Sequence, residues 1–485
     1  MSLTILNPDE AAALEARYAN LLGAQALMSR AGAAAARLVA SRIKAGGVVT
    51  VLAGTGGNGG DAYATALELK RAGYTVHVVA PGGKKPTHEA GAYFHEEWVR
   101  QGGVVEADPY MTPKADCIVD GLLGSAQNRP VTGDMLDAVL WFNERRCFKL
   151  ALDMPTGIHP QTGARLGACP GARADVTLAF LSTKPGLYML DGADAAGEIV
   201  VDELGVSIPL TNLAVVTPED FEHVTQKRLR HAHKGDFGRV RIIGAARGKI
   251  GAGLLAARAA MRLGAGRVTL ECLSESAPEV DALMPEIMFD VETPLSAYDV
   301  LVIGPGLGQD ERALARLEAA LEVQAPLVLD ADALNLTAGH MALQDKLLGR
   351  RYPTVLTPHA MEAARLLRRD VGAVESDRVA AARELAVQTG AIVVLKGPGS
   401  VVALRSGRTW INPTGNAMLA SAGTGDVLAG MIGAFFAQGF DMVASTLAGV
   451  WLHGVSAHAR EAGFTASDVA PRAAQILESM RRRTE

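Results

Sequence analysis

Short apolar runs alternate with helical stretches along most of the chain, and this alternation restricts the possible folds more than any other feature. In the first half, the pattern predicts strands at 48–53, 74–80, 117–120 and 148–153. A glycine loop at 54–60 follows the first strand and leads into a helix predicted over 61–72. Two amphipathic helices, broken near Leu22–Gly23, precede the series. Such alternation predicts a parallel sheet with helices on both faces.

A second series of the same kind fills the remainder of the chain. Its predicted strands lie at 239–243, 267–270, 300–303, 327–329, 354–356 and 392–395, with a helix at 251–263 and two closing helices near 426–438 and 442–461. Between the two series, residues 206–222 mix Pro, Asn and Thr and contain no strong helix. Because 485 residues are too many for one hydrophobic core, the chain is predicted to form two α/β domains. We place them at 1–215, a Rossmann-like three-layer parallel sheet, and at 222–485.

Charge and cysteine content exclude several classes of protein. A formal net charge of −5 provides no basic field for nucleic acid, and no apolar run approaches the ~18 residues of a membrane helix. The acidic N-terminus does not resemble a signal peptide. The four cysteines form no CxxC pair and are expected to be reduced: Cys117, Cys147, Cys169 and Cys272. The chain is therefore predicted to be cytoplasmic, with no membrane or nucleic-acid partner.

The sharpest local motif is Ala422-Gly423-Thr424-Gly425-Asp426, which precedes an apolar helix. Glycines at a helix start let the backbone approach a ligand, and the free N–H groups bind anions. The carboxylate of Asp426 would repel phosphate, but it suits a base that deprotonates a hydroxyl attacking a phosphoryl group. Alone, the motif is equally compatible with a tight turn in which Asp caps the helix.

Further loops in this half carry polar residues directly after predicted strands. Carboxyl ends of parallel strands share one edge of the sheet, where ligands bind, so these loops are expected to converge. The loops are Gly304–Gly308, Asp330–Asn335, Thr357–His359 and Lys396–Ser400. Convergence of so many loops favours a nucleotide site over isolated turns.

Together, "HKGDFGRVRIIG", "GPGLG", "LDADALN", "TPH", "LKGPGS" and "GTGD" resemble the ribokinase-like superfamily, and within it the ADP-dependent NAD(P)H-hydrate dehydratases. The resemblance covers roughly 230–485. It implies a ribokinase-like domain, Asp426 as catalytic carboxylate, ADP as phosphoryl donor and Mg²⁺ as its companion. It assigns the nucleotide to Lys396, Gly397, Pro398, Gly399, Ser400 and Gly425, and the hydrated cofactor to Ala252, Gly306, His359 and Asp426. A ribokinase-like vitamin-precursor kinase is the alternative that would share this chemistry.

In the first half, Asp120 and Asp153 each stand at the end of a predicted strand, and the glycine loop contains Asn58. With Thr156, these oxygen donors suit a hard cation rather than zinc. The simpler interpretation is that each Asp caps the turn that follows it. A lone glycine loop is a weak signal, and no acidic residue ends the next strand as a dinucleotide fingerprint requires.

The segments "GTGGNGGD", "DGLLG", "DMPTG" and "AFLSTKPGLYML" resemble the NAD(P)H-hydrate epimerases over residues 1–212. The resemblance implies a potassium ion at Asn58, Asp120 and Thr156, and a catalytic Asp153. It assigns substrate to Gly57, Asn58, Gly59, Gly60, Asp61, Gly124, Ser125, Arg129, Pro130 and Asp153. The two halves would act on NADHX and NADPHX, the hydrates of NADH and NADPH, in a homo-oligomer.

The chain departs from the family pattern at several positions. In the first half, Gly57 stands where Asn is usual, Ala62 replaces Gly, Ser29 replaces Glu, and 125–128 read "SAQN". In the second half, the departures are Met361, Ser400 and Ala422. A first half that serves as a binding or scaffolding module without catalysis is therefore the alternative to an epimerase.

Overall fold

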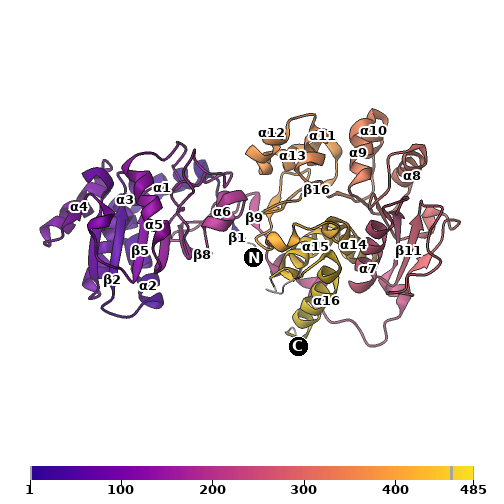
Figure 1. Cartoon of the computed structure of the whole chain (residues 1–485), viewed down its shortest axis with the longest axis horizontal. Coiled ribbons are helices and arrows are strands. Elements are labelled where there is room, and N and C mark those ends of the chain that lie inside the picture. Colours follow the sequence, from indigo (N-terminus) through magenta and orange to yellow (C-terminus); the bar gives the residue numbers. More distant parts are fainter. Residues whose placement is uncertain (1–2, 459–462, 484–485) are drawn as a thin grey trace. The chain divides into compact units, whose positions relative to one another are not determined.

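The computed structural model describes residues 3–458 and 463–483, which fall into two compact units. The first unit spans Thr4–Thr211, and the second contains Leu3 and the chain from Asn212 onward. Both units are α/β, as the alternation predicted (Figure 1). Within the described residues, no helix is both long and apolar enough to cross a membrane, and all four cysteines are free thiols.

The first unit is built on a seven-stranded sheet in the order β4-β3-β2-β5-β6-β7-β8, with every neighbouring pair parallel. Its strands are β2 (Val48–Ala53), β3 (Thr75–Val79), β4 (Val105–Glu106), β5 (Cys117–Gly121), β6 (Phe148–Leu152), β7 (Val176–Phe180) and β8 (Glu198–Asp202). Its helices are α1 (Pro8–Leu22), α2 (Ala24–Arg42), α3 (Gly57–Arg71), α4 (Glu89–Arg100), α5 (Asp134–Glu144) and α6 (Leu190–Ala195). The short strand β4 and the last two strands, β7 and β8, were not predicted.

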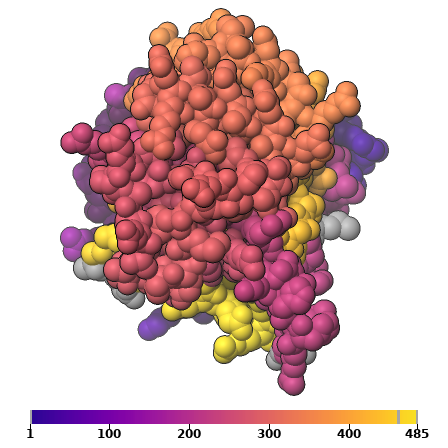
Figure 2. Space-filling model, turned by 90° about the vertical axis from the view of Figure 1, so that its right-hand side faces the viewer, coloured from indigo at the N-terminus to yellow at the C-terminus, as the bar shows by residue number. Residues whose placement is uncertain are grey.

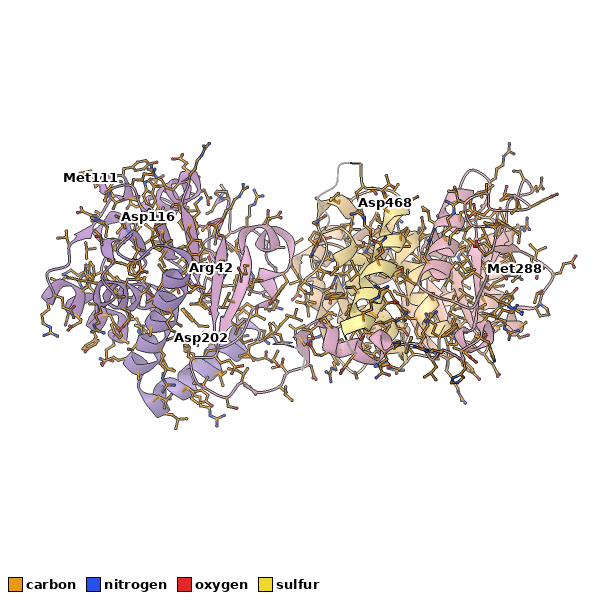
Figure 3. All side chains as sticks on the ribbon, turned by 90° about the horizontal axis from the view of Figure 1, so that it is seen from below. Arg42, Met111, Asp116, Asp202, Met288 and Asp468 are labelled. Carbon is orange, nitrogen blue, oxygen red and sulfur yellow. The ribbon has the colours of Figure 1, made fainter. Side chains whose placement is uncertain are left out.

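Alternating side chains of the strands divide the core of this unit into two layers. Val51 and Val119 pack with α1 to α4, whereas Leu52 and Ile118 pack on the opposite face with α5. This period of two is the signature of a strand buried on both sides. Arg42, the last residue of α2, forms an ion pair with Glu198 of β8 at 2.7 Å. Figure 3 labels Arg42 and also Asp202, the last residue of β8.

The break near Leu22–Gly23 is confirmed, because Gly23 has φ of 90° and separates α1 from α2. The predicted glycine loop at 54–60 is wrong in its second half, since α3 begins at Gly57 rather than Asp61. Glycine's low helix propensity favoured a loop, but packing decided otherwise. A β-carbon at Gly59 would lie 1.9 Å from the carbonyl oxygen of Gly54, so only glycine fits this first turn.

The second unit has an eleven-stranded sheet in the order β1-β9-β18-β17-β16-β15-β14-β13-β10-β11-β12. Its strands are β1 (Leu3–Thr4), β9 (Leu213–Val215), β10 (Arg239–Gly244), β11 (Arg267–Cys272), β12 (Met288–Phe289), β13 (Val300–Ile303), β14 (Leu327–Leu329), β15 (Thr354–Leu356), β16 (Ile392–Leu395), β17 (Val401–Ala403) and β18 (Thr409–Ile411). The block from β12 to β16 is parallel, and β17 runs antiparallel to both of its neighbours. The hairpin β17–β18 and the short strands β1, β9 and β12 were not predicted.

Helices lie on both sides of this sheet (Figure 1). One group packs into the main core: α7 (Ile250–Arg262), α14 (Thr424–Ala437), α15 (Met442–Ser456) and α16 (Ala466–Arg483). The other group comprises α8 (Glu311–Glu322), α9 (Asp332–Gly339), α10 (Met341–Leu348), α11 (Ala360–Leu367), α12 (Val371–Ser376) and α13 (Arg378–Thr389). In Figure 2 the red-to-orange middle of the chain covers most of the face turned to the viewer, with yellow C-terminal residues at its lower edge.

The predicted closing helix at 442–461 ends at Ser456, and its residues 459–461 lie outside the described residues. The prediction of two closing helices is wrong, because α16 follows as a third. Asp468 caps the start of α16 by accepting from the Thr465 N–H at 2.8 Å. The first turn of α16 contains polar residues, and apolar residues recur along one face of the helix. Packing of this face on the core stabilises the helix.

Gly430 lies where α14 crosses α7, and the close approach of the two helices at this glycine gives a stability prediction. A β-carbon at Gly430 would lie 2.1 Å from the carbonyl oxygen of Ala256. We therefore expect Gly430→Ala to lower the free energy of unfolding of the second unit by about 1–3 kcal/mol, through overpacking. Chemical denaturation followed by Trp fluorescence measures this change.

The matched control is Gly372→Ala in α12, where no atom lies within 4 Å of the added β-carbon. It should leave stability unchanged or raise it slightly, because Ala favours helix. Equal stability of the two variants would contradict the packing argument.

Candidate active sites

In the second unit, Asp426 stands in the first turn of α14, beside Lys396 at the end of β16. Gly423 caps the helix with φ of 93°, a conformation that favours glycine. A β-carbon at Gly425 would lie 3.1 Å from the Nζ of Lys396, so the ammonium touches the turn that holds Asp426. The structure thus joins two motifs that are thirty residues apart in sequence.

The surroundings of this turn raise the pKa of Asp426 to about 7. Burial is the main cause, and the neighbouring carboxylate of Asp330 adds to it, while the Lys396 ammonium opposes both. Lys396 itself stays charged: burial opposes its charge, but Asp330 and Glu362 outweigh that effect and its pKa ends above the ordinary value. A carboxyl group with a pKa near neutrality beside a fixed cation is suited to general base catalysis of phosphoryl transfer.

Asp330 is the residue that organises this edge, and the sequence did not single it out as a site residue. It is 1% exposed and follows β14 directly. Its carboxylate accepts from the Nζ of Lys396 at 2.7 Å and from the hydroxyl of Thr357 at 2.7 Å. Its place at a strand end was the available signal. Glu362 was also missed; burial raises its pKa to about 7.

Two of the positions expected to bind the hydrated cofactor meet each other. A β-carbon at Gly306 would lie 3.2 Å from the Cβ of Ala252, so the loop after β13 contacts the start of α7. The Ala246 N–H donates to the carbonyl of Gly306 at 2.7 Å, and this hydrogen bond stabilises the contact. The strand ends of β10 and β13 therefore form one wall of the site.

His359 begins α11 next to Lys396. Its Nδ1 accepts from the N–H groups of Met361 and Glu362 at 3.1 and 3.2 Å, so Nδ1 caps the helix, and its Nε2 lies 3.4 Å from the Oε1 of Glu362. Burial, followed by the charge of Lys396, lowers the pKa of His359 and so favours the neutral ring. Pro398, Gly399 and Ser400 form the turn between β16 and β17, where the Ser400 hydroxyl donates to the Gly397 carbonyl at 3.1 Å.

In the first unit, charged side chains surround a cavity of about 470 Å³. We call it the acidic cavity; its lining includes Glu15, Gly57, Asn58, Asp61, His88, Gly124, Ser125, Asp153 and Lys184. A second space of about 690 Å³, the loop cavity, is lined by Thr55, Lys84, Arg129, Pro130 and Thr132 among others. Both are lined by Leu123, Ala126 and Gln127, so the two cavities adjoin.

Asp153 occupies a strained position at the end of β6. Its φ of 63° is unusual for a residue with a side chain and is a kind of strain that clusters at functional sites. One carboxylate oxygen accepts from the Ser125 N–H at 2.7 Å, and the other is paired with the Nζ of Lys184. Burial alone would raise the pKa of Asp153, but the Lys184 charge and hydrogen bonds outweigh it, so the pKa ends below its usual value.

Lys184 was quoted as part of a family segment but not assigned a role. It is 1% exposed, and its Nζ also donates to the carbonyl of Phe180 at 2.8 Å. Glu15, on α1, was missed entirely, because a carboxylate on an amphipathic helix carries no functional signal in sequence. Gly59 and Gly60 are buried, with Gly60 against Met28 and Gly91, so close packing accounts for them.

The expected cation ligands come from three neighbouring segments: Asn58 from the first turn of α3, Asp120 from the end of β5, and Thr156 from the loop after β6. Asp120 is fully buried and accepts from the Thr156 N–H at 2.9 Å and its hydroxyl at 2.8 Å; burial raises the pKa of Asp120 to about 6. Asn58 donates to the Leu152 carbonyl at 3.1 Å, whereas its buried Oδ1 accepts no hydrogen bond from the described residues. These oxygens are compatible with a hard monovalent cation.

Comparison with known proteins matches both halves. A family model described as NAD(P)H-hydrate dehydratase matches residues 240–479, and one described as YjeF-related protein N-terminus matches residues 24–186. The bifunctional NAD(P)H-hydrate repair enzyme of Escherichia coli is 37% identical over 449 residues, covering 90% of this chain and 85% of that protein. The one from Coxiella burnetii is 34% identical over 470 residues, covering 92% and 93%. A solved ADP/ATP-dependent NAD(P)H-hydrate dehydratase from Bacillus subtilis aligns at 30% identity with 56% of this chain and 99% of its own, with a TM-score of 0.48.

Proposed function

Because the chain belongs to the family of bifunctional NAD(P)H-hydrate repair enzymes, we propose that it restores hydrated nicotinamide cofactors in two steps. The first unit interconverts the R and S epimers of NADHX and NADPHX at C6. The second unit dehydrates the S epimer to NADH or NADPH and converts ADP to AMP and phosphate. Membership over both halves argues against a vitamin-precursor kinase.

The observation that carries the dehydratase assignment is Asp426 beside Lys396 at the start of α14. Hydroxide is a poor leaving group, so the C6 hydroxyl must first be activated. Asp426 takes its proton as the oxygen attacks the β-phosphoryl group of ADP, and Lys396 with the N–H groups of the turn stabilises the charge. The lone pair of the ring nitrogen then expels phosphate from C6, and C5 loses a proton to water, which restores the C5=C6 double bond.

We propose the following roles for the other predicted site residues of the second unit. Gly425 and the Lys396–Ser400 turn hold the nucleotide, and Ala252, Gly306 and His359 line the side where the hydrated ring binds. Within 3–458 and 463–483, no group of three His, Cys, Asp or Glu side chains could hold a metal. Mg²⁺ usually binds through phosphates and one or two carboxylates, so this finding is compatible with Mg²⁺ arriving with the nucleotide.

The pKa of Asp426 predicts the pH dependence of dehydration. A base acts only when ionised, so kcat should rise with pH through a midpoint near 7. In Asp330→Asn, loss of the charge that raises the pKa of Asp426 should move this midpoint to lower pH. Steady-state rates between pH 5 and 9 with saturating ADP measure the shift.

Asp345→Asn, which removes an exposed carboxylate on α10, is the control and should keep the wild-type profile. A midpoint unchanged by Asp330→Asn would show that another group controls the rate.

For the epimerase, the two adjoining cavities suit the two ends of the substrate. The acidic cavity presents Asp153 to the nicotinamide ring, and the loop cavity presents Arg129 and Lys84 to the phosphates. The Ser125 N–H donates to Asp153, which supports a role for the 124–130 loop in orienting the proposed catalytic carboxylate.

We further propose that Asn58, Asp120 and Thr156 hold K⁺. A bound cation would satisfy the Asn58 oxygen and favour the ionised form of Asp120. Replacing K⁺ by tetramethylammonium should slow epimerisation, and Asn58→Ala should remove the dependence on K⁺. An epimerisation rate independent of K⁺ in the wild type would contradict the site.

The proposal also covers the domain limits, the cellular compartment and the oligomeric state of the protein. The domain limits 1–215 and 222–485 enclose both family matches, although β9 (Leu213–Val215) pairs with β18 in the second sheet, which favours a limit near 211. We propose a cytoplasmic protein, because its four free cysteines suit a reducing compartment. We also propose a homo-oligomer, to be tested by light scattering.

The test incubates the purified protein with both NADHX epimers, ADP and K⁺, and follows absorbance of the reduced nicotinamide. Full recovery of NADH supports both activities. Recovery that stops at the S fraction, apart from slow spontaneous epimerisation, supports a dehydratase with a non-catalytic first unit. No recovery with ADP or ATP overturns the proposal.

A further inference from the structure

Four ionisable side chains from four separate elements line the acidic cavity: Glu15 of α1, Asp61 of α3, Asp153 after β6 and Lys184 after β7. Only Asp153 and Lys184 are paired with each other. Asp61 is half-buried on the first turns of α3, and Glu15 is exposed at the rim. The cavity therefore presents one carboxylate paired with Lys184, that of Asp153, and two others, the half-buried Asp61 and the exposed Glu15, to the same space.

From this geometry we infer that the acidic cavity contains a complete acid–base pair for epimerisation, with Asp153 as the base, Asp61 as the proton donor and Lys184 as a positioning residue. The inference rests on the proposed epimerase function and deepens it. Asp61 thereby has a chemical role beyond contact with substrate.

The protonation states of the two carboxyl groups support these roles, because their surroundings separate them. The Lys184 ammonium holds the pKa of Asp153 below its usual value despite burial, so Asp153 is ionised. Burial, with the charges of Glu15 and Asp153, raises the pKa of Asp61 well above its usual value, so Asp61 keeps its proton. Two carboxyl groups whose pKa values are driven apart in one site are the pattern of a base and an acid.

The other groups that face Asp61 from the surrounding elements are consistent with this division. They are Glu15 from α1, His88 before α4, Asp153 after β6 and Lys184 after β7. From α2, the lining is apolar: Ala24, Leu27, Met28 and Ala31. Lys184 is bonded directly to Asp153, so its positive charge stabilises the ionised form of Asp153 more than that of Asp61.

The chemistry balances with these two groups and no further reagent. C6 of the hydrate carries a hydroxyl and the ring nitrogen N1. Asp153 takes the hydroxyl proton, the oxygen pair forms C6=O, the C6–N1 bond breaks, and N1 receives the proton of Asp61. Rotation about the C5–C6 bond turns the other face of the C6 aldehyde to N1. N1 then attacks C6 and returns its proton to Asp61, and the oxygen regains a proton from Asp153. Nothing is oxidised or reduced.

The experiment follows a single separated NADHX epimer by chromatography with the full chain and with ADP and ATP omitted, so that no phosphoryl donor allows dehydration. Asp61→Asn is expected to lower kcat by roughly 10²-fold with little change in KM. Its fold should be retained, because Asn mimics a carboxyl group that is already neutral. Lys184→Met should move the low-pH limb of the rate profile upward, since Asp153 loses the charge that keeps it ionised.

The pH profile separates a chemical role from a structural one. Wild type should lose activity at high pH, where Asp61 loses its proton, and Asp61→Asn should lack this limb. Asp194→Asn and Lys114→Met, which change exposed residues outside both cavities, are the controls.

A wild type that does not accelerate equilibration overturns the epimerase function and the inference with it. An active wild type with an Asp61→Asn variant of similar rate and unchanged high-pH limb overturns the inference alone. An unshifted low-pH limb in Lys184→Met overturns the role given to Lys184.

Discussion

Asp426→Asn should lower kcat for dehydration of the S epimer by about 10²–10⁴-fold while leaving epimerisation intact. The substitution removes the base but keeps the shape of the side chain and its place in the first turn of α14. KM should change little, because the N–H groups of the turn and Lys396 still hold the nucleotide. Steady-state kinetics on the separated S epimer with ADP measures the loss.

The stability of this variant provides an internal check. The folded state raises the pKa of Asp426, so above pH 7 the ionised carboxylate costs folding free energy that the neutral Asn does not. At pH 8, Asp426→Asn should therefore melt at the same temperature as wild type or higher. A lower kcat with unchanged melting identifies lost chemistry rather than lost fold.

The matched control is Asp370→Asn, at an exposed position before α12 where the side chain makes no capping bond. It should retain wild-type kinetics. An Asp426→Asn variant that keeps more than a tenth of the wild-type kcat would require a different base, and Glu362, with a pKa of about 7, would be the next residue to change.

Asp153→Asn should lower the rate of epimerisation by about 10²–10⁴-fold and leave dehydration of the S epimer unchanged. In the coupled assay, recovery of NADH from a mixture of epimers should then stop near the S fraction, apart from slow spontaneous epimerisation. The cause is the loss of the carboxylate that accepts the C6 hydroxyl proton.

This substitution also leaves the buried ammonium of Lys184 without its partner, which can cost roughly 3–5 kcal/mol of stability. The double variant Asp153→Asn with Lys184→Met removes both charges and should regain stability without regaining activity. If the double variant epimerised at the wild-type rate, Asp153 would not be the base.

The sequence by itself determined the α/β class, because alternation of apolar runs and helices is a local pattern that any chain of this kind must satisfy. It also proposed Asp426 and Asp153 as site residues, since Asp426 lies at a helix start beside Gly425 and Asp153 lies at a strand end, and such positions can be identified without contacts. The errors fell where packing overrides local preference. Gly57 begins a helix because Gly59 must fit against Gly54, and α16 forms because its apolar face covers the core.

Only the tertiary structure decided which residues act together and in which protonation state. Lys184 pairs with Asp153 across 31 positions of sequence, and Lys396 with Asp330 across 66. Nothing in the spacing of these residues specifies the pairing, because it depends on the order of strands in each sheet. The pKa of a carboxyl group depends on burial and on charges from other elements, and these act through space. The sequence therefore offered Asp153 and Asp426 as candidate bases, whereas only the fold brought Lys184, Asp330 and Glu362 next to them and set the direction of their pKa shifts.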